Sequence, residues 1–422
     1  MNLPSQLFGD PTTDGRKLTA RDLAHQVPWV TPDTDNLDVV TLFNEHKNLV
    51  SLPVVEQGRP FGLINRQLFL SQMTRPFFRE LYDRKSCIAF MDKTPLVIEA
   101  NSTLEQVADQ VVACGDKTIT DGFILAEEGH YLGLGLGMDL IKTVSQVQAQ
   151  QHQQIMQSIE YARVIQEAML DKSRSAMDMR LQDWCLSWQP RDCVGGDYYV
   201  FLPQPQGFFM MLADCTGHGV PGAFMTVILA GALEKAFQHA SLQAPERVLQ
   251  HVNLAIKETL GQFNQQTRFA LSNDGCDAFA AWIDTAEHRL CWAGARSAAF
   301  LVRPDAEPES LVCDKMGVGY TDTPVDYVWT RHEITFEPQD MLFTVTDGVT
   351  DQPGGERGIM FGKRRIRELL DVHRQSSMNE VSQALMHASE QWQGSEHRRD
   401  DVTWFGFRYG TAIVSSEHRN DQ

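Results

Sequence analysis

The segment ADCTGHGVPGAFMTVILAGALEKAF, residues 213–237, constrains the fold more than any other part of the sequence. An apolar run leads into Asp214, and two glycines and a proline then precede a long apolar segment. This order predicts a buried strand ending at Asp214, a tight turn at Gly217 and Gly219, and a helix with Pro221 in its first turn. A carboxylate at the end of a buried strand costs free energy unless it has a partner. We therefore expect something at this strand end to hold the charge of Asp214.

Three further places have an aspartate where an apolar strand meets a loop. Asp197 follows two glycines and begins an aromatic run, Asp347 ends the run MLFTVT, and Asp400 with Asp401 precedes the last apolar run. Taken singly, each is an ordinary turn residue. Together, carboxylates without a compensating Lys or Arg repel one another, and a divalent cation would relieve that repulsion. The sequence alone does not show that these sites converge.

The chemistry of such a cluster follows from its ligand atoms. Oxygen ligands without a His or Cys set favour Mg²⁺ or Mn²⁺ over Zn²⁺. Two ions about 3.5–4 Å apart could bridge one water, lower its pKa and clamp a phosphoryl oxygen, so that the water attacks phosphorus in line.

Length and composition restrict the class of protein. A chain of 422 residues exceeds a typical single core, so two or three domains are expected. The formal net charge of −18 argues against non-specific binding to nucleic acid and to anionic membranes. The eight cysteines include no CxxC pair, which favours reduced core thiols over a zinc site. With neither a signal pattern nor an apolar run of membrane-spanning length recognised, we expect a cytoplasmic protein.

Two stretches near the N-terminus, starting at Val30 and Val97, resemble each other. Each predicts a short strand, a capped helix, a strand, a Glu-x-Gly turn and another strand. The pair resembles two CBS motifs, a Bateman module, over residues 19–142. The resemblance implies an α+β regulatory domain that binds an adenine nucleotide. Its ribose-binding aspartate would be Asp139, whereas Gln67 stands at that place in the first copy; the alternative for Asp139 is a helix cap.

Residues 143–178 are rich in Gln and helix formers and contain neither Gly nor Pro. Apolar residues recur three and four apart, with a slip in phase, which predicts a helical connector. It is interpreted either as a short coiled coil that makes a homodimer or as one amphipathic helix packed on a neighbouring domain. The CBS-like pair is the other candidate dimer interface.

Five motifs occur in the order found in bacterial PPM-type serine/threonine phosphatases: VGGDYY, ADCTGHGVPGAFM, WAGARSAAFLV, DMLFTVTDGVTD…GIMFGKRRIRELL and RRDDVTWFGF. The chain resembles the SpoIIE/RsbU group of that family, most closely its SiaA-like branch. The resemblance implies a β-sandwich flanked by helices with two Mn²⁺ or Mg²⁺ ions at one edge. It implies that Asp197 and Asp214 bridge the ions and that the Cys215 carbonyl, Asp347 and Asp400 complete the set. Asp401 would orient the loop.

Several residues nearby have two interpretations each. His218 is either a general acid that protonates the leaving oxygen or a residue that braces its loop. Arg191 is either a fork that binds substrate phosphate or a surface residue. Asp277 is either a ligand of an additional metal or an ordinary strand-end residue, and Asp351 is expected to support the ligands. Trp282, Trp292 and Trp404 lie in strand-like runs and are expected in the core.

The sequence thus predicts an α/β multidomain protein. Its expected parts are a tail (1–18), a CBS-pair-like domain (19–142), a helical connector (143–178), a PPM-type phosphatase domain (179–410) and a second tail (411–422). The expected function is metal-dependent hydrolysis of phosphoserine or phosphothreonine, with a STAS-domain anti-sigma-factor antagonist as the implied substrate and the CBS-like pair as regulator. The alternative is a non-catalytic protein that senses a nucleotide and docks a partner.

Overall fold

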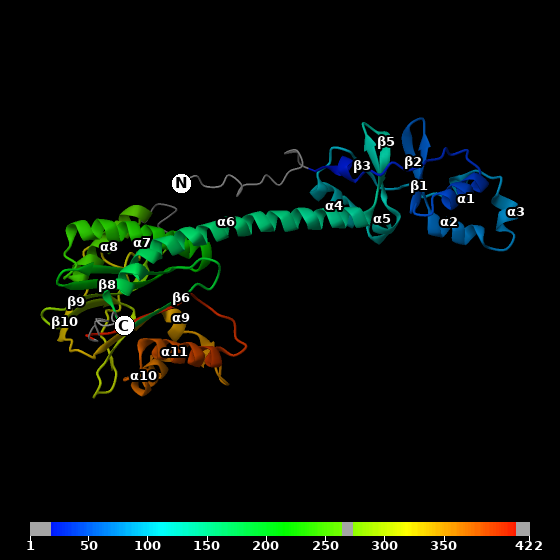
Figure 1. The fold of residues 1–422 in the computed structure, drawn as a ribbon. Coiled ribbons are helices and arrows are strands. Elements are labelled where there is room, and N and C mark those ends of the chain that lie inside the picture. The colour runs from blue at the N-terminus through cyan, green and yellow to red at the C-terminus, as the bar shows by residue number, and fades with distance from the viewer. Residues whose placement is uncertain (1–17, 264–272, 411–422) are drawn as a thin grey trace, which may run out of the picture. The chain divides into compact units, whose positions relative to one another are not determined.

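The computed structural model describes residues 18–263 and 273–410. The chain divides into two compact units, Met1–Ile155 and Met156–Gln422. The division falls within the long helix α6 (Gly137–Arg180), which Figure 1 shows as one continuous element. Both predicted tails lie outside the described residues, apart from Leu18.

The N-terminal unit is built from short helices and two small sheets (Figure 1). Its elements are η1 (Ala20–Leu23), α1 (Asn36–Glu45), β1 (Ser51–Glu56), β2 (Arg59–Asn65), α2 (Arg66–Met73), α3 (Phe78–Tyr82), η2 (Cys87–Phe90), β3 (Val97–Glu99), α4 (Leu104–Cys114), α5 (Asp116–Asp121), β4 (Phe123–Glu127) and β5 (His130–Gly135).

The predicted internal repeat is present in this unit. The first copy has a helix, a strand hairpin and a second helix, α1–β1–β2–α2. The second has the same order with the short helix α5 before the hairpin, α4–α5–β4–β5–α6. The hairpin turns at Gln57–Gly58 and Glu128–Gly129 have positive φ at both residues, as a two-residue turn of this kind requires. In each copy a segment before the hairpin pairs in parallel with the first strand of the hairpin. In the first copy this pairing is the bridge between Val30 and Val54, and in the second copy β3 pairs with β4.

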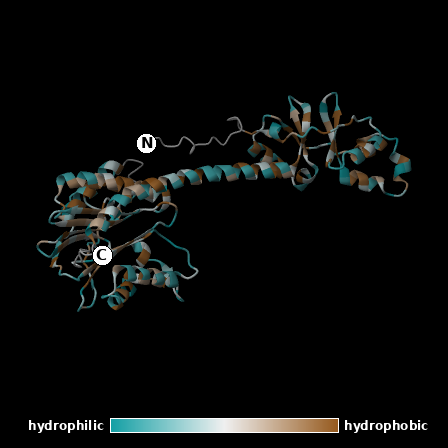
Figure 2. Ribbon diagram, in the orientation of Figure 1, coloured by the Kyte–Doolittle hydropathy of each residue, from teal (hydrophilic) through white to brown (hydrophobic). Residues whose placement is uncertain are grey.

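The helix α6 begins before and ends after the predicted connector. Leu140, Val144 and Val147 pack with the apolar core of the N-terminal unit. Near the other end Gln166, Leu170, Ser173 and Met177 recur three and four apart and are buried in the C-terminal unit, which is the spacing of one helix face. Figure 2 shows mostly hydrophilic residues along α6. Its role in a coiled coil or a homodimer stays a prediction.

The C-terminal unit contains two five-stranded antiparallel sheets, in the orders β13-β10-β9-β8-β7 and β12-β11-β14-β17-β6. Its strands are β6 (Trp184–Gln189), β7 (Asp197–Gln204), β8 (Gly207–Cys215), β9 (Cys276–Asp284), β10 (Arg289–Ala295), β11 (Ala298–Val302), β12 (Glu309–Ser310), β13 (His332–Thr335), β14 (Met341–Val345), β15 (Pro353–Gly354), β16 (Ile359–Met360) and β17 (Val402–Arg408). Its helices after α6 are α7 (Gly219–His239), α8 (Pro245–Leu260), α9 (Asp347–Thr350), α10 (Gly362–Val372) and α11 (Met378–Gln393).

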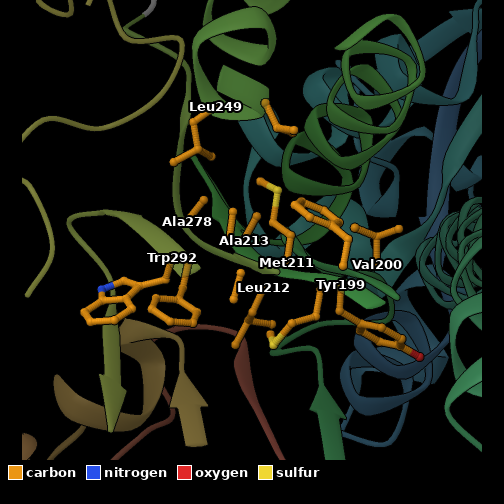
Figure 3. Packing of buried hydrophobic residues seen from close by; sticks show 14 of the residues in the cluster. Tyr199, Val200, Met211, Leu212, Ala213, Leu249, Ala278 and Trp292 are labelled. Carbon is orange, nitrogen blue, oxygen red and sulfur yellow. The ribbon is translucent and has the colours of Figure 1, made fainter. Parts of the chain in front are cut away.

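The two sheets form a sandwich covered by helices on both outer faces. Helices α7 and α8 contact the first sheet, and α10 and α11 contact the second (Figure 1). Side chains alternate along β8: in Figure 3 Met211 and Ala213 point to the side of Leu249 in α8, and Leu212 points to the opposite side. The central strands are therefore apolar on both faces.

The two predictions about apolar segments have different outcomes. Trp282, Trp292 and Trp404 are buried, which confirms them as core residues. The expectation that no apolar segment is long enough to cross a membrane was wrong by length and composition, because α7 meets both criteria. Its buried face packs with α8 and the first sheet, so tertiary packing accounts for the apolar residues on that face.

Candidate active site

Three aspartates lie side by side at one edge of the first sheet. The strand register places Asp197 of β7 opposite Asp214 of β8, and Asp214 opposite Asp277 of β9. Directly opposed residues in an antiparallel pair have Cβ atoms about 4.5–5.5 Å apart. Like charges at that separation destabilise a sheet, so the register alone concentrates negative charge at this edge.

The second sheet brings further carboxylates to the same place. Asp347 follows β14, and Asp400 and Asp401 precede β17, the neighbour of β14. A Cβ atom at Gly348 would lie 1.9 Å from the Asp401 carbonyl oxygen, so only glycine allows these loops to approach this closely. The sheets are joined by the Thr346 hydroxyl, which donates a hydrogen bond of 2.9 Å to Asp197 Oδ2. The four main predicted ligands therefore converge.

Burial and mutual repulsion dominate the electrostatics of this cluster. Burial, foremost, raises the pKa of Asp197 and Asp214 well above the usual range, and neighbouring carboxylates raise both further. Burial also raises the pKa of Asp347, whose carboxyl shares a hydrogen bond with that of Asp214. For Asp277, burial raises the pKa to about 6, although Arg296 acts in the opposite direction. Without a cation, the cluster therefore holds protons that ordinary carboxylates would have released.

The residues present fit a hard divalent cation. Asp197 Oδ1 and Asp277 Oδ1 are buried without a hydrogen-bond partner among the described residues. Buried carboxylate oxygens without a hydrogen-bond partner are the kind of ligand atom that Mg²⁺ and Mn²⁺ prefer. Within residues 18–263 and 273–410, however, no three His, Cys, Asp or Glu side chains already enclose a metal-sized position. Binding would therefore require the carboxylates to draw together.

The glycines around Asp197 and Cys215 allow close backbone packing. Gly217 and Gly219 have φ of +87° and +63°, as the predicted turn requires. A Cβ at Gly196 would lie 2.9 Å from the Cys215 carbonyl oxygen and 2.5 Å from the Gly217 carbonyl oxygen. The backbone N–H of Cys215 donates to the Gly196 carbonyl at 3.1 Å. This packing places the Cys215 carbonyl next to the backbone of Gly196, the residue that directly precedes Asp197.

Asp401 connects the loop before Asp197 to the second sheet. Its carboxylate is 2 % exposed and accepts backbone N–H bonds from Arg191 and Gly196, both at 2.6 Å. Asp400 Oδ1 instead accepts the Asp401 N–H at 2.9 Å, and its charge raises the pKa of Asp214 and Asp347. Asp351 is the C-cap residue of α9, and its charge also raises the pKa of Asp347.

Three predicted site residues stand apart from the carboxylate cluster. His218 Nδ1 lies 2.9 Å from the Asp192 carboxylate, a pairing that fits the loop-bracing interpretation. The Arg191 guanidinium is exposed and donates to the Arg399 carbonyl at 2.9 Å. In the N-terminal unit, Asp139 lies in the first turn of α6 and its carboxylate is 2.6 Å from His25 Nε2.

Sequence reasoning missed three residues beside the cluster. A cavity of about 30 Å³, room for a water or two, is lined by Asp214, Asp277 and Asp347 together with Thr346, Arg296 and Lys363. The available signal was a pair of cations next to apolar strands: Arg296 stands in GARS after β10, and Lys363 stands in FGKRR at the start of α10. Neither spacing indicated that they would meet the aspartates.

Comparison with known proteins matches both units. The family described as Stage II sporulation protein E (SpoIIE) matches residues 204–410, and the CBS domain family matches residues 20–73. The phosphoserine phosphatase RsbU of Bacillus subtilis is 22% identical over 250 residues, which cover 59% of this chain and 68% of RsbU. The solved SiaA-PP2C domain of Pseudomonas aeruginosa is 30% identical with a TM-score of 0.56, and the match covers 61% of this chain and 98% of that domain.

Proposed function

Since the chain belongs to the SpoIIE group of PP2C-type (PPM) phosphatases and is a protein phosphatase, we propose that it hydrolyses phosphoserine or phosphothreonine with two divalent cations held at the carboxylate edge. The observation that carries this proposal is the convergence of Asp197, Asp214 and Asp347 from both sheets, with a buried oxygen of Asp197 left without a partner.

The proposed ligands are the Asp197, Asp214, Asp347 and Asp400 carboxylates and the Cys215 carbonyl. When bound, Mn²⁺ or Mg²⁺ would supply a water of lowered pKa as the nucleophile. The protein's own contribution is to hold these oxygens in place: Thr346 donates to Asp197, and Asp401 accepts from the loop that precedes it. Ligands held by such bonds need less reorganisation when a cation binds.

His218 keeps two roles in this proposal. As a general acid it would donate a proton to the leaving serine or threonine oxygen. As a brace it would hold the turn before α7 through Asp192, and the 2.9 Å pairing supports this second role. Replacement of Asp192 distinguishes the two roles. Activity should fall if His218 braces the turn, since the brace needs Asp192, and should persist if His218 acts as a general acid.

The wider context is also proposed. We propose a partner-switching role in which the substrate is a phosphorylated STAS-domain-like protein in the cytoplasm. The likeness to the phosphoserine phosphatase RsbU supports a phosphoserine substrate. We propose that the CBS-like pair binds an adenine nucleotide or a similar small ligand. The cavity of about 400 Å³ near Asp92, Lys117 and Asp121 has a suitable size for such a ligand, whereas Asp139 is engaged with His25. Homodimerisation through α6 or the CBS-like pair belongs to the same proposal.

Regulation through α6 is supported by one buried side chain. Gln166 is 4 % exposed; its Nε2 donates to the Gly195 carbonyl at 2.7 Å, and its Oε1 accepts the Gly195 N–H at 3.2 Å. Gly195 lies two residues before Asp197. A shift of α6 would therefore pull on the loop that positions a proposed metal ligand.

We expect Gln166→Ala to lower turnover about tenfold or more while the protein stays folded, because two hydrogen bonds to the ligand loop are lost. The measurement is kcat with saturating Mn²⁺, beside a thermal unfolding curve. The matched control is Gln153→Ala, at an exposed position of the same helix. Equal turnover of the Gln166 variant and wild type would argue against coupling through this contact.

The proposed function is tested by phosphate release from an aryl phosphate and from a phosphoserine peptide. Wild type is expected to be inactive in a chelator and active when Mn²⁺ or Mg²⁺ is restored, and Asp347→Asn is expected to stay inactive at every metal concentration. Turnover that persists in chelator, or an active Asp347→Asn, would contradict the two-cation proposal. A folded wild type without turnover on either substrate would favour the non-catalytic alternative.

A further inference from the structure

Two cations line a cavity together with two of the proposed metal ligands, Asp214 and Asp347. Arg296 and Lys363 share it with Asp214, Asp277 and Asp347. Neither cation forms an ion pair with these three aspartates within the described residues, since Arg296 pairs with Asp322 and Lys363 donates to the Ser297 carbonyl. Their positive charge is therefore available to a group bound against this cavity, whose own volume of about 30 Å³ admits only a water or two.

Arg296 is held firmly in an unusual backbone conformation. It occupies the turn between β10 and β11 with φ of +54°, a region that costs a non-glycine residue free energy. Its N–H donates to the Asp314 carbonyl at 2.8 Å, its Nε donates to the Lys315 carbonyl at 3.0 Å, and the guanidinium lies 5.1 Å from the centre of the Tyr320 ring. These contacts fix the guanidinium and leave Nη1 without a hydrogen bond among the described residues.

Lys363 approaches the same turn from the second sheet's helix layer. It lies in the first turn of α10, and its Nζ donates to the Ser297 carbonyl at 3.3 Å. An ammonium group has three donors, so this contact orients the group without using its full capacity. The two cations thus flank Ser297 from different elements.

We propose that Arg296 and Lys363 form a pair that binds the phosphoryl group of the substrate and positions it against the carboxylate edge. A phosphate dianion approaching a cluster of aspartates is repelled until positive charge compensates both. A guanidinium fork and an ammonium group beside the cluster provide that charge and hydrogen-bond donors for phosphoryl oxygens. This inference rests on the proposed function, and it assigns to Arg296 and Lys363 the role that the sequence suggested for Arg191.

The two candidate sites for phosphate recognition differ in position. The Arg191 side chain is exposed, bonds to the Arg399 carbonyl and does not line the cavity. Arg296 lines the cavity and acts on the charge of Asp277, whose pKa it lowers against the effect of burial. Position relative to the carboxylates therefore favours Arg296.

The test compares Arg296→Gln, Lys363→Gln and Arg191→Gln in the full chain. For the first two we expect the KM for an aryl phosphate and the inhibition constant of inorganic phosphate to rise about tenfold each, because a charge-assisted hydrogen bond is lost. The matched control is Arg364→Gln, which removes one positive charge from the same helix turn at an exposed pair with Glu368. Its two constants are expected to equal those of wild type.

Three results would overturn the inference. One is an unchanged inhibition constant in Arg296→Gln and Lys363→Gln. Another is a rise confined to Arg191→Gln. The third is a change in the Mn²⁺ concentration needed for activation with no change in phosphate inhibition, which would make Arg296 a partner of Asp277 only.

A calorimetric titration separates this inference from the proposed function. Mn²⁺-loaded wild type and Arg296→Gln are titrated with inorganic phosphate, without any turnover. Weaker binding by the variant supports the phosphate-binding pair even if no substrate is hydrolysed. Equal binding contradicts the pair even if wild type is an active phosphatase.

Discussion

The Asp197→Asn variant is expected to lose turnover by about a thousandfold or more and, without metal, to be more stable than wild type. Asp197 is fully buried, one carboxylate oxygen has no partner among the described residues, and burial raises its pKa well above the usual range. An amide has nearly the same shape and no charge, and its oxygen can still accept the Thr346 hydrogen bond. Removing the charge should increase the free energy of unfolding of the metal-free protein by about 1–3 kcal/mol.

A substitution that lowers activity but raises stability identifies a carboxylate that serves function and not folding. The measurements are phosphate release with Mn²⁺ and urea unfolding in chelator. Seven of the eight tryptophans follow residue 180, so their fluorescence reports mainly on the C-terminal unit. The control is Asp284→Asn at the other end of β9, whose carboxylate accepts backbone N–H bonds from Ala286 and Glu287. That variant should remain active and be no more stable than wild type, whereas a destabilised Asp197→Asn would mean that Asp197 serves structure.

The second large effect is a fall in the stability of the metal-free protein as pH rises. The folded-state pKa of Asp277 is about 6, and burial raises those of Asp197, Asp214 and Asp347 above the unfolded value of about 4. The folded protein therefore binds these protons more tightly than the unfolded chain. Their contribution is most favourable below about pH 4 and is lost as pH rises through the folded-state values, through about pH 6 for Asp277.

Unfolding in chelator at pH 5, 6, 7 and 8 measures this effect. We expect the midpoint temperature of wild type to fall by roughly 10 °C across the series and that of Asp197→Asn to fall less. Saturating Mn²⁺ should reverse the trend, because cation binding requires deprotonated carboxylates and stabilises the folded state. A pH profile that is the same for both proteins would show that other groups set the dependence.

The local patterns of the sequence predicted the elements that carry the site. Glycines after Asp214 predicted a turn at that strand end, and positive φ at Gly217 and Gly219 confirms it, whereas Asp347 begins the short helix α9. The repeat at Val30 and Val97 predicted matching hairpins, and residues 143–178 predicted a helix that in the structure extends over Gly137–Arg180. These features depend on residues close together in the chain, which is why a single sequence contains them.

The order of the motifs along the chain indicated the fold and the site residues of the C-terminal unit, which the spacing of residues within each motif did not. The five phosphatase-like motifs indicated the fold of the C-terminal unit and named the four aspartates, and the matches to the SpoIIE family and the SiaA-PP2C domain agree with that fold. Length and composition alone were less reliable. No run of membrane-spanning length was recognised in the sequence, yet α7 has that length and composition, and its buried face packs on α8 and the first sheet.

The sequence by itself determined the types of residue at the strand ends, the turns beside them and the helical character of the connector. Only the tertiary structure decided which strand ends meet. The strand register sets Asp197, Asp214 and Asp277 in one row, and close packing of Gly348 against Asp401 brings the second sheet to the same edge. It also decided that Arg296 and Lys363 line the cavity, whereas Arg191 lies outside it. Such pairings join residues far apart in the chain, and they arise from the packing of two sheets rather than from any local pattern.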